Sequence, residues 1–306
     1  MLNPVLGGVL LPEKLPQLTS LIARFLDIVG KRLPDDVIQR LTEMRTNAAP
    51  GLEQVIYDSM FENMEQAQAL NRPICQDTGV ISFYVKVGSD SKLLPILKEA
   101  LTKGVLEATV SSPLRHNAVA IFDEKNTATN TGERIPFIYW DIVSGNEVEI
   151  EAYMAGGGGS LPGRAITLMP SAGYDGVAKY VLDTMVELGV NACPPLLVGV
   201  GIAGSAEIAS LLSKKAILRP LGSTHQNHRG AQFEQLLAEG LNNLGVGAQG
   251  LPGKAFVIGV HVETAARHPS SLSVGVSVGC WAHRRGTLVL HDDLTYELVS
   301  HRGVAI

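Results

Sequence analysis

Apolar residues recur at helical spacing through most of the first seventy positions of the chain. Pro34 and two aspartates precede the segment VIQRLTEMR, and Pro50 with a glycine precedes LEQVIYDSMFENMEQAQALN. In the longer segment the apolar side chains stand three or four residues apart, as one face of a helix requires. We therefore predict helices in both segments and interpret residues 1–33 as a helical N-terminal extension.

Runs of β-branched and aromatic residues follow, separated by turn residues. VISFYVKVG predicts a strand that ends at Gly88, and LPILKEALTKGVLEATV predicts a helix. The runs IPFIYWDIV and EVEIEAYM, joined by the turn residues SGN, are typical of a β-hairpin. A polar loop from Ser111 to about Arg134 is expected between the helix and the hairpin.

Beyond Tyr153, glycine-rich loops alternate with apolar elements. We predict helices in GYDGVAKYVLDTMVELG, SAEIASLLSKKAIL and GAQFEQLLAEGLNNLG, and strands in LLVGVG, KAFVIGVHVE, LSVGVSVG and GTLVLHD. The pattern mixes parallel-like and antiparallel-like units, and no low-complexity linker separates them. The expected fold class is therefore α+β: a single mixed domain over residues 1–306, with a helical N-terminus and mixed or antiparallel sheets flanked by helices.

Composition and charge narrow the possible functions. A chain of 306 residues with 45% hydrophobic content can bury a substantial core. Its net charge is −5, and no block of Lys and Arg exists to bind a polyanion, which argues against nucleic acid and anionic membrane as partners. The N-terminus lacks the basic region and cleavage site of a signal peptide, and no apolar run has spanning length. We predict a cytoplasmic protein.

Each of the three cysteines stands where the backbone is expected to turn. Cys75 lies in RPICQDTG, Cys193 precedes two prolines, and Cys280 follows a glycine. Structural cysteines more often lie inside apolar helices or strands, whereas loops with accessible N–H groups suit iron–sulfur ligation. Three thiolates would leave one iron of a cubane open as a Lewis acid. From the residues alone, inert thiols fit equally well, and a redox or mixed Cys/His metal site is a third interpretation.

Six motifs stand in order along the chain, namely RPICQDTGVISFYVKVG, PLRHNAVAIFDE, YMAGGGGSLPGR, NACPPLLVGVGIA, ARHPSSLSV and GCWAHRRGTLVLHDDLTYE. With them the chain resembles the class I iron–sulfur fumarase family, from about Pro34 to its last residues. The resemblance implies a [4Fe-4S] cluster that is bound by Cys75, Cys193 and Cys280 and has one iron without a protein ligand.

The resemblance also implies an activity. It implies a hydro-lyase that acts on a small dicarboxylate and converts L(+)-tartrate to oxaloacetate and water, because AYMAGGGGSLPGR and CWAHRRGT favour this substrate. The alternative is the α subunit of a two-subunit fumarate hydratase. A further alternative, from another class of protein, is a non-catalytic subunit that carries a cluster as a sensor or scaffold.

The resemblance extends to individual site residues. Gln76 and Asp77 match residues that contact substrate, and Asp77 is expected to act as the catalytic base or to orient it. Arg115 matches an arginine that binds a substrate carboxylate, as a guanidinium is suited to do. Gly158 matches a glycine whose backbone N–H approaches the substrate, and His268 matches an active-site histidine.

A partner is expected as well. Class I fumarases carry a C-terminal swivelling domain, which is a separate β chain in the two-subunit enzymes, and the present sequence reaches Ile306 without it. We therefore expect a β subunit that carries this domain, an α2β2 heterotetramer with an α–α contact, and little or no activity of the chain alone.

Two further motifs have simpler interpretations. Residues 199–204 read G-x-G-x-x-G, but the acidic residue that a dinucleotide site needs about twenty positions later is absent. We predict close packing of a strand on a helix at these glycines. His225 and His228 form H-x-x-H without a carboxylate at helical spacing, so a solvated loop is predicted in preference to a zinc site.

Overall fold

The computed structural model describes residues 11–306, and its contacts divide the chain into two compact units. Unit 1 comprises Met1–Asp35, Asn63–Ala155 and Arg284–Ile306, and unit 2 comprises Asp36–Glu62 and Gly156–His283. The organisation of residues 1–306 as one domain stays a prediction. None of the helices in the described part of the chain combines the length and the apolar character needed to cross a membrane.

The described part of the chain begins with helices, as the apolar spacing predicted. They are α1 (Leu11–Lys31), α2 (Asp35–Thr46) and α3 (Leu52–Ala69). In unit 1, α1 packs against α4 (Leu94–Ser111), where a Cβ on Gly104 would lie 2.5 Å from Cγ2 of Ile22. The glycine therefore lets the two helices approach closely. Residues 1–10 of the expected extension lie outside the described residues.

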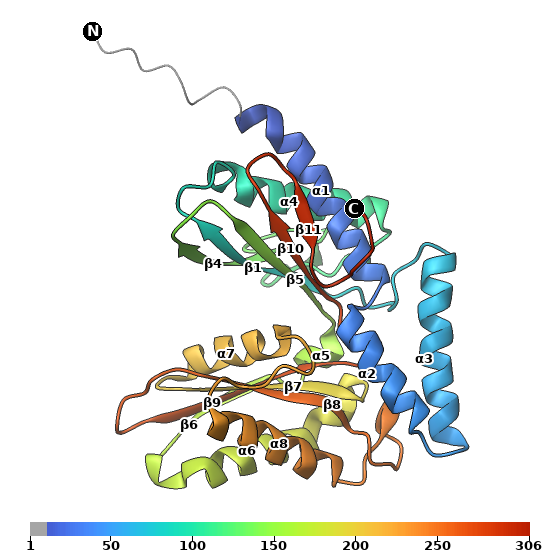
Figure 1. Ribbon diagram of the computed structural model, residues 1–306, viewed down its shortest axis with the longest axis vertical. Helices are drawn as coiled ribbons and strands as arrows, with labels where there is room; N and C mark the ends of the chain where they lie inside the picture. Colours follow the sequence, from blue (N-terminus) through green and yellow to red (C-terminus); the bar gives the residue numbers. More distant parts are fainter. Residues whose placement is uncertain (1–10) are drawn as a thin grey trace. The chain divides into compact units, whose positions relative to one another are not determined.

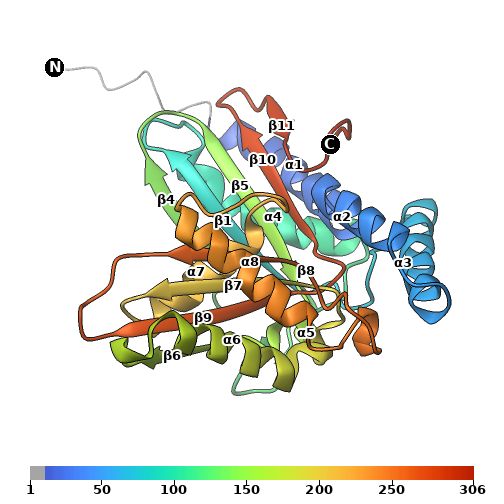
Figure 2. The same ribbon diagram turned by 60° about the horizontal axis from the view of Figure 1, so that its bottom comes forward.

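Unit 1 contains a five-stranded mixed sheet, on which α1 and α4 pack (Figure 2). Its order is β11-β10-β5-β1-β4; β1 and β4 are parallel, and the other neighbours are antiparallel. The strands are β1 (Val80–Gly88), β4 (Phe137–Val143), β5 (Val148–Ala155), β10 (Arg285–Leu290) and β11 (Tyr296–Leu298). The polar loop after α4 holds the short pair β2 (Val119–Ala120) and β3 (Lys125–Asn126).

The predicted hairpin is wrong, because β4 and β5 do not pair with each other. β1 lies between them, parallel to β4 and antiparallel to β5. The link from β4 to β5 crosses the end of β1, where a Cβ on Gly88 would lie only 2.1 Å from the carbonyl oxygen of Gly145. The turn at SGN was predicted correctly. Its two flanking strands, however, both pair with β1, which is mostly buried.

Unit 2 contains a four-stranded mixed sheet in the order β6-β9-β7-β8, with β7 and β8 parallel (Figure 1). Helix α7 packs on one face, and α6 and α8 pack on the other (Figure 1). The strands are β6 (Arg164–Leu168), β7 (Leu196–Ala203), β8 (Val257–Thr264) and β9 (Leu272–Gly279). The helices are α5 (Gly157–Ser160), α6 (Gly173–Leu188), α7 (Ala206–Leu218), α8 (His228–Asn242) and the 3-10 turns η1 (Pro170–Ala172), η2 (Gly189–Ala192) and η3 (Ala248–Gly250).

The glycines of the G-x-G-x-x-G segment bring α7 against the sheet, which confirms the packing interpretation. A Cβ on Gly199 would lie 2.2 Å from the carbonyl oxygen of Ser213, and a Cβ on Gly201 would lie 2.0 Å from that of Ala209. Any larger residue would force the helix away from the strand. With mixed sheets and packed helices in both units, the α+β fold class is confirmed.

Candidate active site

The loop RPICQDTG is anchored in unit 1 by hydrogen bonds and by a close backbone contact. The backbone N–H of buried Ile74 donates to the carbonyl of Gly30 at 3.0 Å, and the Ile74 carbonyl accepts from Nδ2 of Asn63 at 2.9 Å. Cys75, the next residue, is half-buried. Gly79 has φ +82, and a Cβ there would lie 2.6 Å from the carbonyl carbon of Ala155. The loop is therefore anchored just before Cys75 and just before β1.

The QDTG turn is hydrogen-bonded to the segment that carries Arg115. Oδ1 of Asp77 accepts from the backbone N–H of Gly79 at 3.0 Å, and Gln76 is exposed. The hydroxyl of Thr78, which is 4% exposed, accepts from the Arg115 N–H at 3.0 Å and from Nδ2 of Asn117 at 3.2 Å. It donates to the Arg115 carbonyl at 3.3 Å, so its hydrogen-bonding capacity is used completely.

Asparagines support the other side of the Arg115 segment. The N–H of Asn117 donates to Oδ1 of Asn130 at 2.9 Å, and Asn130, 2% exposed, donates to Oγ1 of Thr109 at 3.1 Å. The Arg115 side chain itself is exposed. The structure thus joins the QDTG turn to the backbone of the Arg115 segment through Thr78, and the sequence analysis missed Thr78, Asn117 and Asn130 as supports of these segments. The sequence could have indicated two of these residues, because Thr78 lies in the motif RPICQDTG and Asn117 lies in PLRHNAVAIFDE.

Thr78→Val is expected to lower the free energy of unfolding of the chain by about 1–3 kcal/mol. Valine has nearly the volume of threonine, but it leaves the buried polar partners of the hydroxyl without a hydrogen bond. Denaturant unfolding monitored by circular dichroism measures this. Thr78→Ser, which keeps the hydroxyl, is the matched control and should retain most of the stability. Equal stability of the valine variant and the native chain would show that the Arg115 segment does not depend on this hydroxyl.

In unit 2, Cys193 and Cys280 lie at the same end of the four-stranded sheet. Cys193 is exposed, has a left-handed backbone at φ 56, and stands just before β7; Cys280 is half-buried and directly follows β9. β7 and β9 are antiparallel neighbours, with Leu197 opposite Gly279. The Cys193 carbonyl accepts from the N–H of Trp281 at 3.2 Å. The backbones that carry these two cysteines are therefore in direct contact.

Gly158 belongs to the same end of unit 2. It lies in the helical turn α5, and a Cβ on it would stand 2.8 Å from the carbonyl oxygen of Asn191, two residues before Cys193. A Cβ on Gly159 would stand 3.2 Å from the carbonyl oxygen of Val278, two residues before Cys280. The glycine run is thus a packed turn against both cysteine segments, and a Cβ would force a shift at Gly158 and be tight at Gly159.

His268 lies elsewhere in unit 2. A Cβ on Gly204, which follows the C-terminal end of β7, would lie 3.3 Å from the backbone nitrogen of His268. The eight residues of β7 span about 23 Å, so His268 stands at the opposite end of the sheet from Cys193 and Cys280. Its side chain is exposed, and Nδ1 accepts from the N–H of Ser270 at 3.1 Å. Within unit 2 the structure does not bring His268 to the cysteines, and its role stays a prediction.

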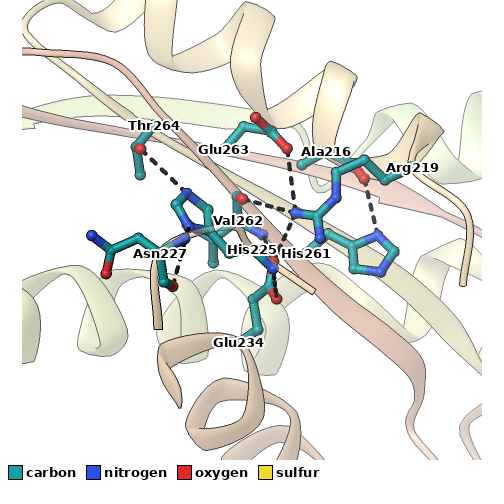
Figure 3. A network of polar contacts seen from close by, with 9 residues as sticks. All are labelled: Ala216, Arg219, His225, Asn227, Glu234, His261, Val262, Glu263 and Thr264. Atoms are coloured by element: carbon teal, nitrogen blue, oxygen red, sulfur yellow. Dashed lines mark hydrogen bonds and ion pairs between the residues drawn. The ribbon is translucent and has the colours of Figure 1, made fainter. Parts of the chain in front are cut away.

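His225 belongs to a polar network around buried Glu234 (Figure 3). Glu234 accepts from the His225 N–H at 2.9 Å, from the Val262 N–H at 2.8 Å and from Nη1 of Arg219 at 2.8 Å. Nδ1 of His225 accepts from the Asn227 N–H at 2.9 Å, which fixes the start of α8. These contacts give His225 a structural role in the loop.

Within residues 11–306, no three His, Cys, Asp or Glu side chains gather around the position of a single metal ion. The three cysteines are divided between the units, with Cys75 in unit 1 and Cys193 and Cys280 in unit 2.

Comparison with known proteins connects these motifs to a family. The family model for fumarate hydratase (Fumerase) matches residues 19–289, which includes most of α1. The L(+)-tartrate dehydratase subunit alpha of Escherichia coli strain K12 is 55% identical over 291 residues, 95% of this chain and 96% of that relative. The putative L(+)-tartrate dehydratase subunit alpha of Methanocaldococcus jannaschii is 37% identical over 257 residues, 83% of this chain and 90% of the relative.

Proposed function

The chain belongs to the fumarate hydratase (Fumerase) family, and from that premise we propose that it is the α subunit of an L(+)-tartrate dehydratase, a hydro-lyase that forms oxaloacetate and water. The observation that carries the proposal is the 55% identity, over 95% of the chain, to relatives that bear this name. Fumarate hydratase is the second candidate, because the family model bears that name.

We propose Cys75, Cys193 and Cys280 as the ligands of a [4Fe-4S] cluster with one iron that lacks a protein ligand. Two features of the chain fit an anionic group of this kind. Cys193 is an exposed residue whose carbonyl is hydrogen-bonded to the Cys280 segment, and the buried guanidinium of Arg284 has donors that lack partners among the described residues. When bound, the cluster supplies a Lewis acid for departure of the substrate hydroxyl.

The side chains of unit 1 would bind the substrate and move its proton. Arg115 binds a carboxylate of the dianion through its exposed guanidinium, and exposed Gln76 also contacts the substrate. Asp77 accepts the C3 proton or orients the group that does, and the Gly79 N–H holds its carboxylate in place. Proton loss beside a carboxylate builds negative charge, which Arg115 and the backbone N–H at Gly158 stabilise. Loss of this proton and of the C2 hydroxyl gives water and the enol of oxaloacetate.

The proposed enzyme includes a second subunit. The relatives are named as alpha subunits, and we infer a β subunit that carries the remaining substrate contacts, an α2β2 assembly and a cytoplasmic location, where reducing conditions keep thiolates available.

The chain co-produced with its β subunit and loaded anaerobically with iron and sulfide should release oxaloacetate from L-tartrate with a higher kcat/KM than from meso-tartrate or malate. The chain alone should show little turnover. Faster interconversion of malate and fumarate would identify the fumarate hydratase instead. A cluster-loaded complex that acts on none of these substrates would point to a sensor or scaffold.

A further inference from the structure

Arg284 is the largest fully buried side chain described, at 1% exposure. Its Nε and Nη1 atoms have no hydrogen-bonding partner among the described residues. A guanidinium keeps its charge at any pH a protein tolerates, so it cannot escape burial by losing a proton. Buried donors of a charged group are costly to leave without a partner, and an anion beside the guanidinium would supply one for both Nε and Nη1.

The backbone of Arg284 is held at one end of the sheet of unit 1. Its carbonyl accepts from the N–H of Met154 at 3.0 Å, and Met154 pairs on its other side with Ile81 of β1. Two strand spacings, about 10 Å, therefore separate Arg284 from the start of β1. The QDTG turn enters the sheet at that end, where Gly79 lies against Ala155. The backbone of Arg284 and the end of the Cys75 loop thus lie at the same end of the unit 1 sheet.

Arg284 is also close to a second cysteine along the sequence. Only Trp281, Ala282 and His283 separate it from Cys280. A cluster ligated by thiolates is anionic, and positive charge and N–H donors near its sulfurs control its reduction potential and its retention. A guanidinium can direct several N–H groups at such a centre, whereas a lysine carries its donors on one atom.

We propose that Arg284 is the buried cationic partner of the cluster and that its Nε–H and Nη1–H donate to the cluster's sulfur atoms. This inference rests on the proposed iron–sulfur function. It goes beyond that function because it assigns the compensation of the cluster's negative charge to a residue that is neither a ligand nor a substrate contact.

The test compares Arg284→Met, which removes the charge at similar length, with Arg284→Lys, which keeps it. Arg302→Met, at an exposed arginine of the same unit, is the matched control. Each full chain is prepared with its β subunit, without the cluster and after anaerobic loading. Thermal unfolding is followed without the cluster. Reduction is titrated by EPR with the cluster bound, and the rate of iron loss to a chelator is measured.

With the cluster bound, Arg284→Met should lower the equilibrium constant for reduction by about tenfold, which is about 59 mV for one electron, and speed iron loss by about tenfold. Arg284→Lys should fall between this variant and the wild type. Without the cluster, Arg284→Met should melt no lower than the wild type, since it removes an uncompensated buried charge. Arg302→Met should change none of these values.

Three results would overturn the inference. One is that cluster-loaded Arg284→Met has the same reduction potential and the same rate of iron loss as the wild type. Another is a lower melting temperature of that variant without the cluster, which marks an ordinary structural arginine. The third is a shift seen only with tartrate present, which assigns Arg284 to a substrate carboxylate. If the wild type binds no cluster, the proposed function falls too; if it binds the cluster and turns over tartrate, only the role of Arg284 is lost.

Discussion

Cys280→Ser should abolish both cluster binding and tartrate turnover. A serine hydroxyl is close in size to the thiol but is a poor ligand for iron in a cluster, so the change removes one of the three proposed ligands with little effect on packing. The Lewis acid that would be lost contributes several kcal/mol, so activity should fall by about a thousandfold or more. Iron and sulfide content, EPR of the reduced protein and oxaloacetate release measure the two effects.

Ser270→Ala is a suitable control for the cysteine variant. Ser270 is exposed, lies beside His268 at the opposite end of the unit 2 sheet, and should tolerate the change with unaltered iron content. Cys193→Ser should reproduce the result of Cys280→Ser, because it removes another of the three proposed ligands. A Cys280→Ser chain that retains the cluster and full turnover would remove Cys280 from the ligand set.

Asp77→Asn should reduce turnover by about 10² to 10⁴ while leaving the cluster spectrum unchanged. The amide keeps the shape of the side chain, and its oxygen can still accept from the Gly79 N–H, but it cannot take a proton. Single-turnover assays with L-tartrate, run beside absorbance and EPR spectra, separate loss of chemistry from loss of the cluster.

The chain offers a matched control for the Asp77 variant. Oδ1 of Asp293 accepts from the N–H of Thr295 at 2.9 Å, the same contact two residues on that Asp77 makes with Gly79. Asp293→Asn should therefore reproduce any effect on turn geometry, with turnover intact. Equal turnover of Asp77→Asn and the wild type would exclude Asp77 as the base or as its orienting group.

Local sequence patterns predicted most elements but not which strands pair. VISFYVKVG and the helix after it were found correctly, since their patterns are long and strongly apolar. The pairing of β4 with β5 was wrong because a short turn favours a hairpin only when no third strand competes, and β1 pairs with both. Strand β6 was missed because its RAITL run is short, and it follows a glycine-rich segment that looked like continuous loop.

The candidate site was predictable where the motif itself contains the contact. QDTG and PLRHN are joined by Thr78, and the glycine run packs against both cysteine segments of unit 2. Burial of Arg284 was not predictable, because HRR has the composition of an exposed segment. The position of His268 was not predictable either: closeness to Cys280 along the sequence suggested closeness in space, but the whole length of β9 lies between them.

The order in which the segments of unit 1 are synthesised bears on when a cofactor could be inserted. Strands β10 and β11 come after Cys280 in the chain, yet β10 is the neighbour that β5 requires on its second side. All three cysteines therefore precede, in order of synthesis, the strand that completes the sheet beside the Cys75 loop. If the chain binds the proposed cluster, the folded surroundings of Cys75 are complete only once residues 285–290 have been made, and a chain shortened before them would lack this neighbour of β5.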